Sequence, residues 1–265
     1  MRICLVLLFA MFSVPFGAQA QDYQVQDYKA EIKSAETLGQ MIYEQDIAGW
    51  VATDELLSDK TYVEKITPNL KGWVSLKDRK NYKTVFIGIY EGTPKAIFEV
   101  SSRKRKVKSS QKIPEGRLLS DNELSRWNAR QKVIGETFEH CPEFTPMNTI
   151  VIPVPDDPEN RLYSYLFSAS QQPGVIVFGK HYRFTLSQDA SEVLDKRDFS
   201  KSCIGIPRPT SLNAAGALIS HIMRPSPEEH HVFANLVQQL DIYVTIPETE
   251  QLWKVSEGKI SKVKQ

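Results

Sequence analysis

The N-terminal apolar segment most constrains this chain, because it decides the compartment in which the rest of the sequence must fold. One positive charge, Arg2, precedes an apolar run over residues 3–12, and an Ala-x-Ala triplet follows at residues 18–20. This order is typical of a cleavable secretory signal. Pro15 interrupts the run before it reaches the roughly 20 apolar residues that a membrane-spanning helix needs. We therefore expect residues 1–20 to be a signal peptide and the mature protein to be periplasmic or secreted.

The composition of the mature chain excludes one broad class of partner. Cleavage leaves 265 − 20 = 245 residues, and the loss of Arg2 reduces 33 basic residues to 32, against 32 acidic residues. Nucleic-acid binding needs a net or strongly localised positive field, so a formally neutral chain argues against it. No second apolar segment reaches membrane-spanning length. We expect a globular protein with no transmembrane segment after signal cleavage.

Cys141 and Cys203 are the two cysteines that the mature chain retains. An oxidising compartment favours pairing of an even number of cysteines, so we predict a disulfide between them. The alternative is a nucleophilic Cys141 with its neighbour His140 as the base. Adjacent side chains usually point apart, and a thiol nucleophile needs an activating base within reach, so we favour the disulfide.

The first half of the mature chain has the pattern of a helix followed by an antiparallel meander. Apolar residues recur with a near-helical period over residues 34–57, where we expect Ile42 and Trp50 to face the core. Gly39 and Gly49 are weak points of this helix. Three strand-like segments follow, the last two joined by a hairpin turn. They are residues 72–76, 82–90 and 95–101.

A basic segment at residues 103–112 follows the meander. Its first cations are Arg103, Lys104, Arg105, Lys106 and Lys108. Such a run can bind anionic lipid or polysaccharide, although solvated strand ends and linkers have the same composition. The segment also separates two predicted regions, an α+β region over residues 21–115 and a second domain over residues 116–265.

The second region begins with a well-signalled helix. Ser120 and Glu123 have the spacing of a capping box, and Leu124, Trp127 and Ile134 would form its buried stripe. Strand-like segments follow, the first of them a continuous apolar run typical of a strand covered on both faces. They are residues 149–154, 162–168, 175–178, 181–186, 199–206, 217–222, 242–245 and 251–255.

A second capped helix is predicted after residue 225. Ser226 would be its N-cap, Pro227 its first residue and Glu229 the third position of a capping box. Three of the five histidines lie here, namely His221, His230 and His231. A catalytic zinc needs three protein ligands and an open position.

The candidate metal ligands are His221, Glu229 and His230. Helical geometry turns His230 toward the core side and His231 toward solvent, so we do not expect the two neighbours to bind one ion. The simpler interpretation is a capping glutamate beside partly exposed histidines. A metal site here would hold zinc. Because the set of candidate ligands is incomplete, the sequence assigns no cofactor.

The element order over residues 118–258 resembles the JAB/MPN (JAMM) fold. In that family a strand supplies two histidines spaced by one residue, and a helix that opens with Pro-Ser presents an acidic ligand. The resemblance matches His221 to one histidine, Ser226 to the serine and Glu229 to the acidic ligand, whereas Met223 occupies the other histidine position. The resemblance implies a mixed sheet flanked by helices. Active members of the family are zinc isopeptidases, but the missing histidine implies a catalytically silent relative. Short sequence stretches such as residues 179–183 also resemble a group of uncharacterised exported bacterial proteins. That resemblance suggests no particular activity.

Three functional hypotheses follow from the sequence. The first is an exported envelope protein whose non-catalytic JAB/MPN-like domain binds another envelope protein or a cell-wall component. The second is a zinc-dependent hydrolase of amide bonds in peptides or cell-wall stems, with His221 and Glu229 as its catalytic candidates. The third is an adaptor that binds an anionic surface through residues 103–112.

Overall fold

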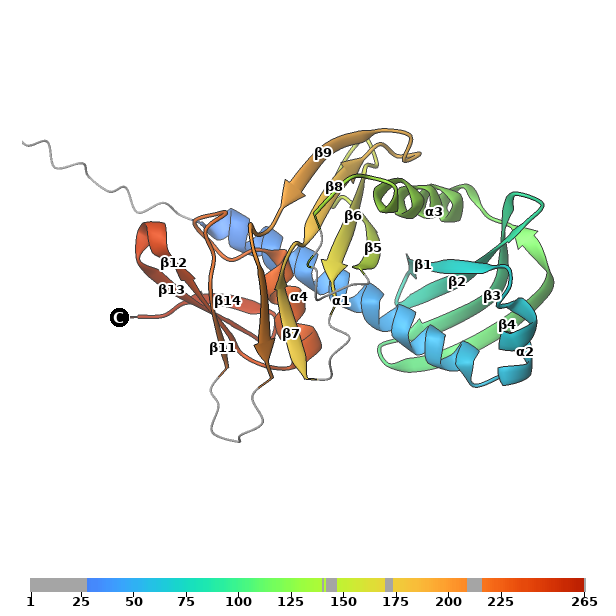
Figure 1. Cartoon of the computed structure of the whole chain (residues 1–265), viewed down its shortest axis with the longest axis horizontal. Coiled ribbons are helices and arrows are strands. Elements are labelled where there is room, and N and C mark those ends of the chain that lie inside the picture. Colours follow the sequence, from blue (N-terminus) through green and yellow to red (C-terminus); the bar gives the residue numbers. More distant parts are fainter. Residues whose placement is uncertain (1–27, 140, 142–146, 170–173, 209–215, 265) are drawn as a thin grey trace, which may run out of the picture.

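One long helix, α1 (Lys29–Leu57), runs through most of this α+β protein and packs against elements from both halves of the chain (Figure 1). The computed structural model describes residues 28–139, 141, 147–169, 174–208 and 216–264. The predicted signal peptide lies outside the described residues. The predicted class is confirmed: a helix and an antiparallel meander come first, and antiparallel and mixed sheets with further helices follow.

The packing of α1 explains its glycines and corrects one prediction. Ile42 is fully buried, as predicted, but Trp50 is 64% exposed. The two positions lie about 80° apart around the helix, so one can face the core while the other faces solvent. Gly39 lies where α1 meets the last helix, and a Cβ added there would come within 2.5 Å of Val232 Cβ. The glycine therefore permits a close contact between the two helices.

The first sheet is an antiparallel meander in the order β1-β2-β3-β4. Its strands are β1 (Leu70–Asp78), β2 (Asn81–Tyr90), β3 (Thr93–Arg103) and β4 (Lys106–Leu118), and a short helix α2 (Lys60–Ile66) precedes them. The basic segment forms the β3–β4 turn and the start of the exposed edge strand β4. The predicted boundary between residues 115 and 116 falls inside β4.

Helix α3 (Asp121–Ile134) lies between the first sheet and a second one. The predicted capping box of Ser120 and Glu123 is present, and Trp127 is buried. The prediction for Leu124 and Ile134 was wrong, since they are 37% and 48% exposed. The helix has sheets on two sides, so its buried surface is displaced from the single stripe that we expected.

The second sheet is antiparallel in the order β5-β6-β8-β9. Its strands are β5 (Met147–Pro153), β6 (Leu162–Ser168), β8 (Tyr182–Leu186) and β9 (Val193–Asp198). Tyr182, Phe184 and Leu186 share a buried face of β8, as the alternating pattern predicted, and Arg183 points to the other side. The opposite side of this sheet packs on α1, where Ile42 meets aromatic residues of β6.

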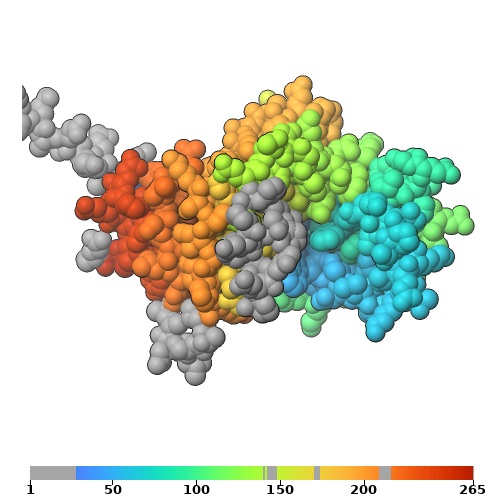
Figure 2. Space-filling view, viewed as in Figure 1, coloured from blue at the N-terminus to red at the C-terminus, as the bar shows by residue number. Residues whose placement is uncertain are grey.

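The C-terminal part contains a mixed sheet in the order β11-β12-β13-β14, a two-stranded ribbon of β7 and β10, and helix α4 (Glu229–Gln238). The strands are β7 (Val175–Gly179), β10 (Cys203–Pro207), β11 (Ala217–Ser220), β12 (Ile242–Ile246), β13 (Gln251–Ser256) and β14 (Lys259–Lys262), with a 3₁₀ turn at Pro247–Thr249. In the space-filling view, this part and the first sheet occupy opposite ends of the molecule (Figure 2).

The predicted disulfide is present: the sulfur atoms of Cys141 and Cys203 lie 2.09 Å apart and connect the segment after α3 to β10. Within the described ranges, no helix combines the length and the apolar character needed to cross a membrane.

Candidate metal centre

Three imidazoles come together where β11 ends and α4 begins. β11 pairs in parallel with β12, and the N–H of His221 extends this pairing by donating to the carbonyl of Thr245 at 2.9 Å. The chain then turns through Pro225 and Pro227 and enters α4, whose second and third residues are His230 and His231. This short connection returns the start of the helix to the end of the strand.

The three histidines have the proximity of a metal site. Each offers one ring nitrogen, and these atoms all lie within 4.8 Å of one another. The ring centroids of His230 and His231 are 3.7 Å apart, and those of His221 and His231 are 4.8 Å apart. All three side chains are 5% exposed or less.

The burial of His231 contradicts the prediction that it faces solvent, and its proximity to His230 contradicts the expectation that the neighbours diverge. The error was to assume a solvent-facing side at the start of α4, since its first four residues are all buried; its N-cap is also Glu228, and not Ser226. Side chains in the first turn of a helix lean back toward its N-terminus. Adjacent residues at that end can therefore approach the same point in space.

Glu228 lies against His221 and was not predicted as a site residue. Its Oε2 is 3.1 Å from Nε2 of His221, and Arg197 from β9 donates to its other oxygen. The 3.1 Å contact lacks hydrogen-bond geometry, so both atoms have no hydrogen-bond partner among the described residues, and the same holds for Nδ1 of His230. Buried polar atoms are nearly always paired, so these three atoms have capacity left for a bound group. The only sequence signal for Glu228 was its position between His221 and His230.

His231 differs from the other two imidazoles, because its Nδ1 accepts a hydrogen bond from the backbone N–H of Glu228 at 3.0 Å. This bond caps α4. A neutral ring that accepts at Nδ1 carries its proton at Nε2, and that proton must leave before Nε2 can bind a metal. His221 and His230 are therefore the stronger ligands, and His231 is the weakest of the three.

The protonation states suit metal binding. Burial, with a further contribution from Arg197 and Arg224, lowers the pKa of His221 to about 4. Burial and the neighbouring imidazoles hold the pKa values of His230 and His231 well below the usual value. All three rings are then neutral at pH 7. A neutral ring binds a metal through its unprotonated nitrogen, and in His231 that nitrogen already accepts from Glu228.

Glu229, the acidic ligand that the sequence suggested, lies outside the group of three imidazoles. Its Oε1 accepts from Arg183 at 2.7 Å and from the hydroxyl of Tyr165 at 3.3 Å. Glu228 and Glu229 thus point to different partners, and Glu228 is the one beside His221.

The remaining histidines are separate from this group. In His181, Nδ1 accepts the N–H of Ser168 at 3.1 Å, and Nε2 lies 3.2 Å from the carbonyl of Val177, so both nitrogens are engaged. This ring packs 6.1 Å from that of His230 as part of the surrounding wall. His140 lies outside the described residues.

An open pocket of about 620 Å³ adjoins the centre. Its walls come from the start of α1, from β8 and β9, and from the turn before α4. The lining residues are Tyr28, Ala30, Glu31, Ser34, Ala35, Leu38, Arg183, Arg197, Arg224, Pro225, Ser226, Pro227, Glu228 and Glu229. Glu228 belongs to this lining and the three imidazoles do not, so the carboxylate separates the centre from the pocket.

Comparisons of this chain with family models, with curated proteins and with solved structures find no match. The resemblance to the JAB/MPN fold therefore stays a prediction. What the structure itself defines is an α+β protein with one disulfide and a buried imidazole cluster.

Proposed function

We propose that this chain is an exported, non-catalytic metal-binding protein, in which His221, His230 and His231 hold one divalent transition-metal ion. The observation that carries the proposal is the convergence of the three ring nitrogens within 4.8 Å. Imidazole ligands suit zinc, copper, iron and nickel, and zinc fits a small, closed site best. Glu228 would complete the set as a fourth ligand or as the acceptor that orients His221.

The burial of the site favours a structural metal over a catalytic one. A catalytic zinc keeps an open position for water or substrate. The imidazoles are at most 5% exposed, and Glu228 stands between them and the pocket with one oxygen held by Arg197. A bound ion would hold the end of β11 to the start of α4 and so fix the wall of the pocket. The binding function of a JAB/MPN-like domain, toward an envelope protein or a cell-wall component, would then belong to this pocket.

The disulfide supports the periplasmic or secreted location that the N-terminal segment predicts. Cell fractionation with N-terminal sequencing of the mature protein tests this part. We expect a start after residue 20 and recovery outside the cytosol, and an uncleaved chain in the cytosol would contradict it.

Metal content tests the centre. We expect the purified mature protein to contain close to one equivalent of zinc by elemental analysis, and His230→Ala to contain almost none. Glu229→Gln is the matched control, because it alters the adjacent residue but leaves the imidazoles in place. Circular dichroism confirms folding of both variants. Metal loss in Glu229→Gln with retention in His230→Ala would reverse the assignment of ligands.

A second candidate is a zinc-dependent amide hydrolase, and one observation favours it: Glu228 both lines the pocket and contacts His221. A zinc ion would supply Lewis-acid activation of water in such an enzyme. Glu228 would accept the proton of that water, and Arg197 would position its carboxylate. Metal-dependent cleavage of cell-wall stem peptides that is lost in Glu228→Gln, with metal content retained, would favour this candidate.

A further inference from the structure

A second pocket, of about 630 Å³, lies beside the middle of α1. The β1–β2 and β3–β4 turns lie at the same end of the first sheet, and α1 passes beside them. The lining residues are Gln40, Tyr43, Glu44, Ile47, Lys77, Arg79, Lys80, Tyr82, Arg103, Lys104 and Arg105. The sequence indicated only the last three cations. The fold adds three more cations, Lys77, Arg79 and Lys80, from the β1–β2 hairpin, more than twenty residues earlier in the chain.

The charge of this pocket is strongly unbalanced. Six of its lining residues are cations, and Glu44 is its one acid. Glu44 is already occupied, since it accepts from Lys77 at 3.3 Å and from the hydroxyl of Tyr82 at 3.0 Å. Asp78 is a further acid on the neighbouring turn. The excess of positive charge therefore favours an anionic partner.

Four of the six cations are free to meet such a partner. Arg105 donates to the hydroxyl of Tyr43 at 3.2 Å, and Lys77 pairs with Glu44. The other four, Arg79, Lys80, Arg103 and Lys104, are exposed and form no ion pair with any residue that the structure describes. Like charges held together in this way repel one another, and a bound anion would relieve that repulsion.

An exposed aromatic residue lies on the same side of α1 as Tyr43, about two helical turns further along. Trp50 lies one turn of α1 beyond Ile47 and points within about 20° of the direction of Tyr43. Its side chain is 64% exposed, whereas Trp127 and Trp253 are 5% exposed. Tryptophan favours the boundary between lipid headgroups and acyl chains, and lysine and arginine attract anionic headgroups. A soluble glycan would use the cations but would not require an exposed indole outside the pocket.

We infer that this surface docks the protein on membranes containing anionic phospholipids, with a headgroup phosphate in the basic pocket and Trp50 at the interface. The inference is independent of the metal centre, because none of the three imidazoles lines this pocket. It concerns the full mature chain, and no part of it depends on catalysis.

Vesicle co-sedimentation tests the docking surface. The probe is vesicles of phosphatidylglycerol and phosphatidylcholine, with pure phosphatidylcholine as the neutral control. The variant Lys80→Gln/Arg103→Gln removes two cations from the pocket. The matched control, Lys262→Gln/Lys264→Gln, removes two exposed cations from β14 and the segment after it, outside the pocket, and causes the same change in net charge.

We expect the pocket variant to bind anionic vesicles roughly thirtyfold more weakly, since each cation near the surface contributes about fivefold. The control should stay within about twofold of the unmodified protein, and binding should weaken steeply with salt. Equal losses in the two variants, or equal binding to neutral vesicles, would overturn the inference.

Trp50 separates a membrane from a soluble polyanion. Anionic vesicles should shift the tryptophan fluorescence to the blue, and Trp50→Phe should abolish this shift and weaken vesicle binding. Heparin binding should be unaffected by Trp50→Phe. Tight binding to heparin together with vesicle binding that is insensitive to Trp50 would overturn lipid docking in favour of a glycan.

Discussion

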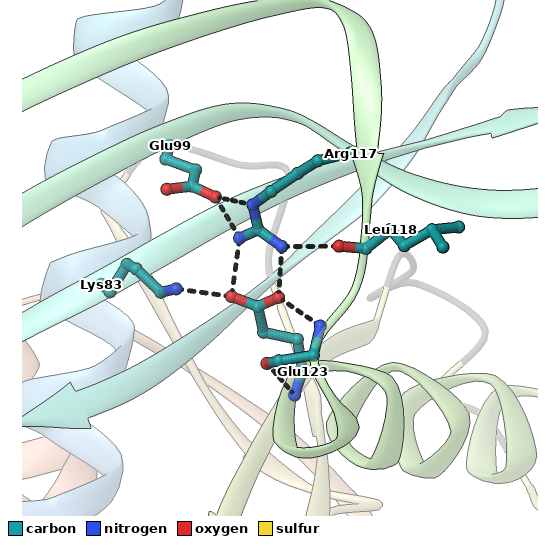
Figure 3. A network of polar contacts seen from close by, with 6 residues as sticks. Lys83, Glu99, Arg117, Leu118 and Glu123 are labelled. Atoms are coloured by element: carbon teal, nitrogen blue, oxygen red, sulfur yellow. Dashed lines mark hydrogen bonds and ion pairs between the residues drawn. The ribbon is translucent and has the colours of Figure 1, made fainter.

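Two buried polar clusters hold this protein together in different ways, and their contrast indicates which one is built for a ligand. In the first, around Glu123 at the start of α3, every charge has its partner (Figure 3). Glu123 is 1% exposed and accepts from Arg117 at 2.7 and 2.8 Å, from Lys83 at 2.6 Å and from the N–H of Ser120 at 2.9 Å. Arg117 also donates to Glu99. This network joins β2, β3 and β4 to α3.

The second cluster, around His221, is more deeply buried but incompletely paired. Nε2 of His221, Oε2 of Glu228 and Nδ1 of His230 have no hydrogen-bond partner among the described residues. A satisfied network stabilises a fold by itself, whereas orphaned buried atoms destabilise it until something binds. The Glu123 cluster is therefore a structural connection, and on the function proposed above the His221 cluster is a site that a ligand would stabilise.

The largest effect should come from breaking the satisfied network. Burial raises the pKa of Glu123, but the bonds from Arg117 and Lys83 outweigh it and lower the pKa to about 2. Glu123→Gln removes the charge at nearly constant volume and should reduce the free energy of unfolding by about 3 kcal/mol in urea titrations. Asp121→Asn, exposed in the same helical turn, should cost less than about 1 kcal/mol. Zinc content should not change in either variant, and a loss of zinc in Glu123→Gln would erase the contrast between the clusters.

Metal should stabilise the second cluster by a slightly smaller amount. At a free zinc concentration 100 times the dissociation constant, the free energy of unfolding of the chelator-treated protein should rise by about 2.7 kcal/mol. Urea unfolding with and without zinc measures this. His230→Ala should show almost no rise, and an equal rise in His230→Ala would place the zinc elsewhere.

The pH dependence of stability provides a third comparison. The pKa of His221 is about 4 in the folded protein, against an ordinary histidine value of 6.5, so the unfolded chain binds the proton more strongly. Stability is therefore lost as the pH falls from about 6.5 toward 4, by about 2 kcal/mol at pH 5 for this histidine. Asp46 acts in the opposite sense, because burial raises its pKa to about 6.

His221→Asn isolates the contribution of the histidine. Urea unfolding of chelator-treated protein at pH 7.5 and pH 5 should show a smaller acid-induced loss in the variant than in the unmodified chain. Identical losses would mean that His221 is not held neutral by the fold.

The smallest effect should separate His231 from its neighbours. Because its Nδ1 caps α4, His231→Ala should cost about 1 kcal/mol of stability even without metal, as measured by thermal unfolding after chelation. It should weaken zinc binding less than His221→Ala or His230→Ala does. If His231→Ala abolishes zinc binding while His221→Ala retains it, the order of ligand strength is wrong.

The sequence predicted much of the fold because its signals were local. The alternation in residues 182–186 and the capping box at Ser120 each depend on neighbouring residues, and both are confirmed. The basic edge strand β4 has no apolar alternation, because neither face of it is buried, so its composition could not be told from that of a linker.

The metal centre depended on details that a pattern cannot supply. The start of α4 is buried on all sides, including the side of His231 that the helical period assigned to solvent. The approach of Arg197 to Glu228 joins strand β9 to a turn 31 residues later, and that contact exists only in the folded chain. The same is true of the basic pocket, where two separate turns supply the cations.

Anomalous diffraction at the zinc edge, from crystals of the mature protein grown with zinc, tests the central claim most directly. We predict a single strong peak within about 2.1 Å of a ring nitrogen from each of His221 and His230, with His231 and Glu228 next to it. A peak on surface carboxylates alone, with ordered water in hydrogen bonds to Nε2 of His221 and Nδ1 of His230, would contradict the account.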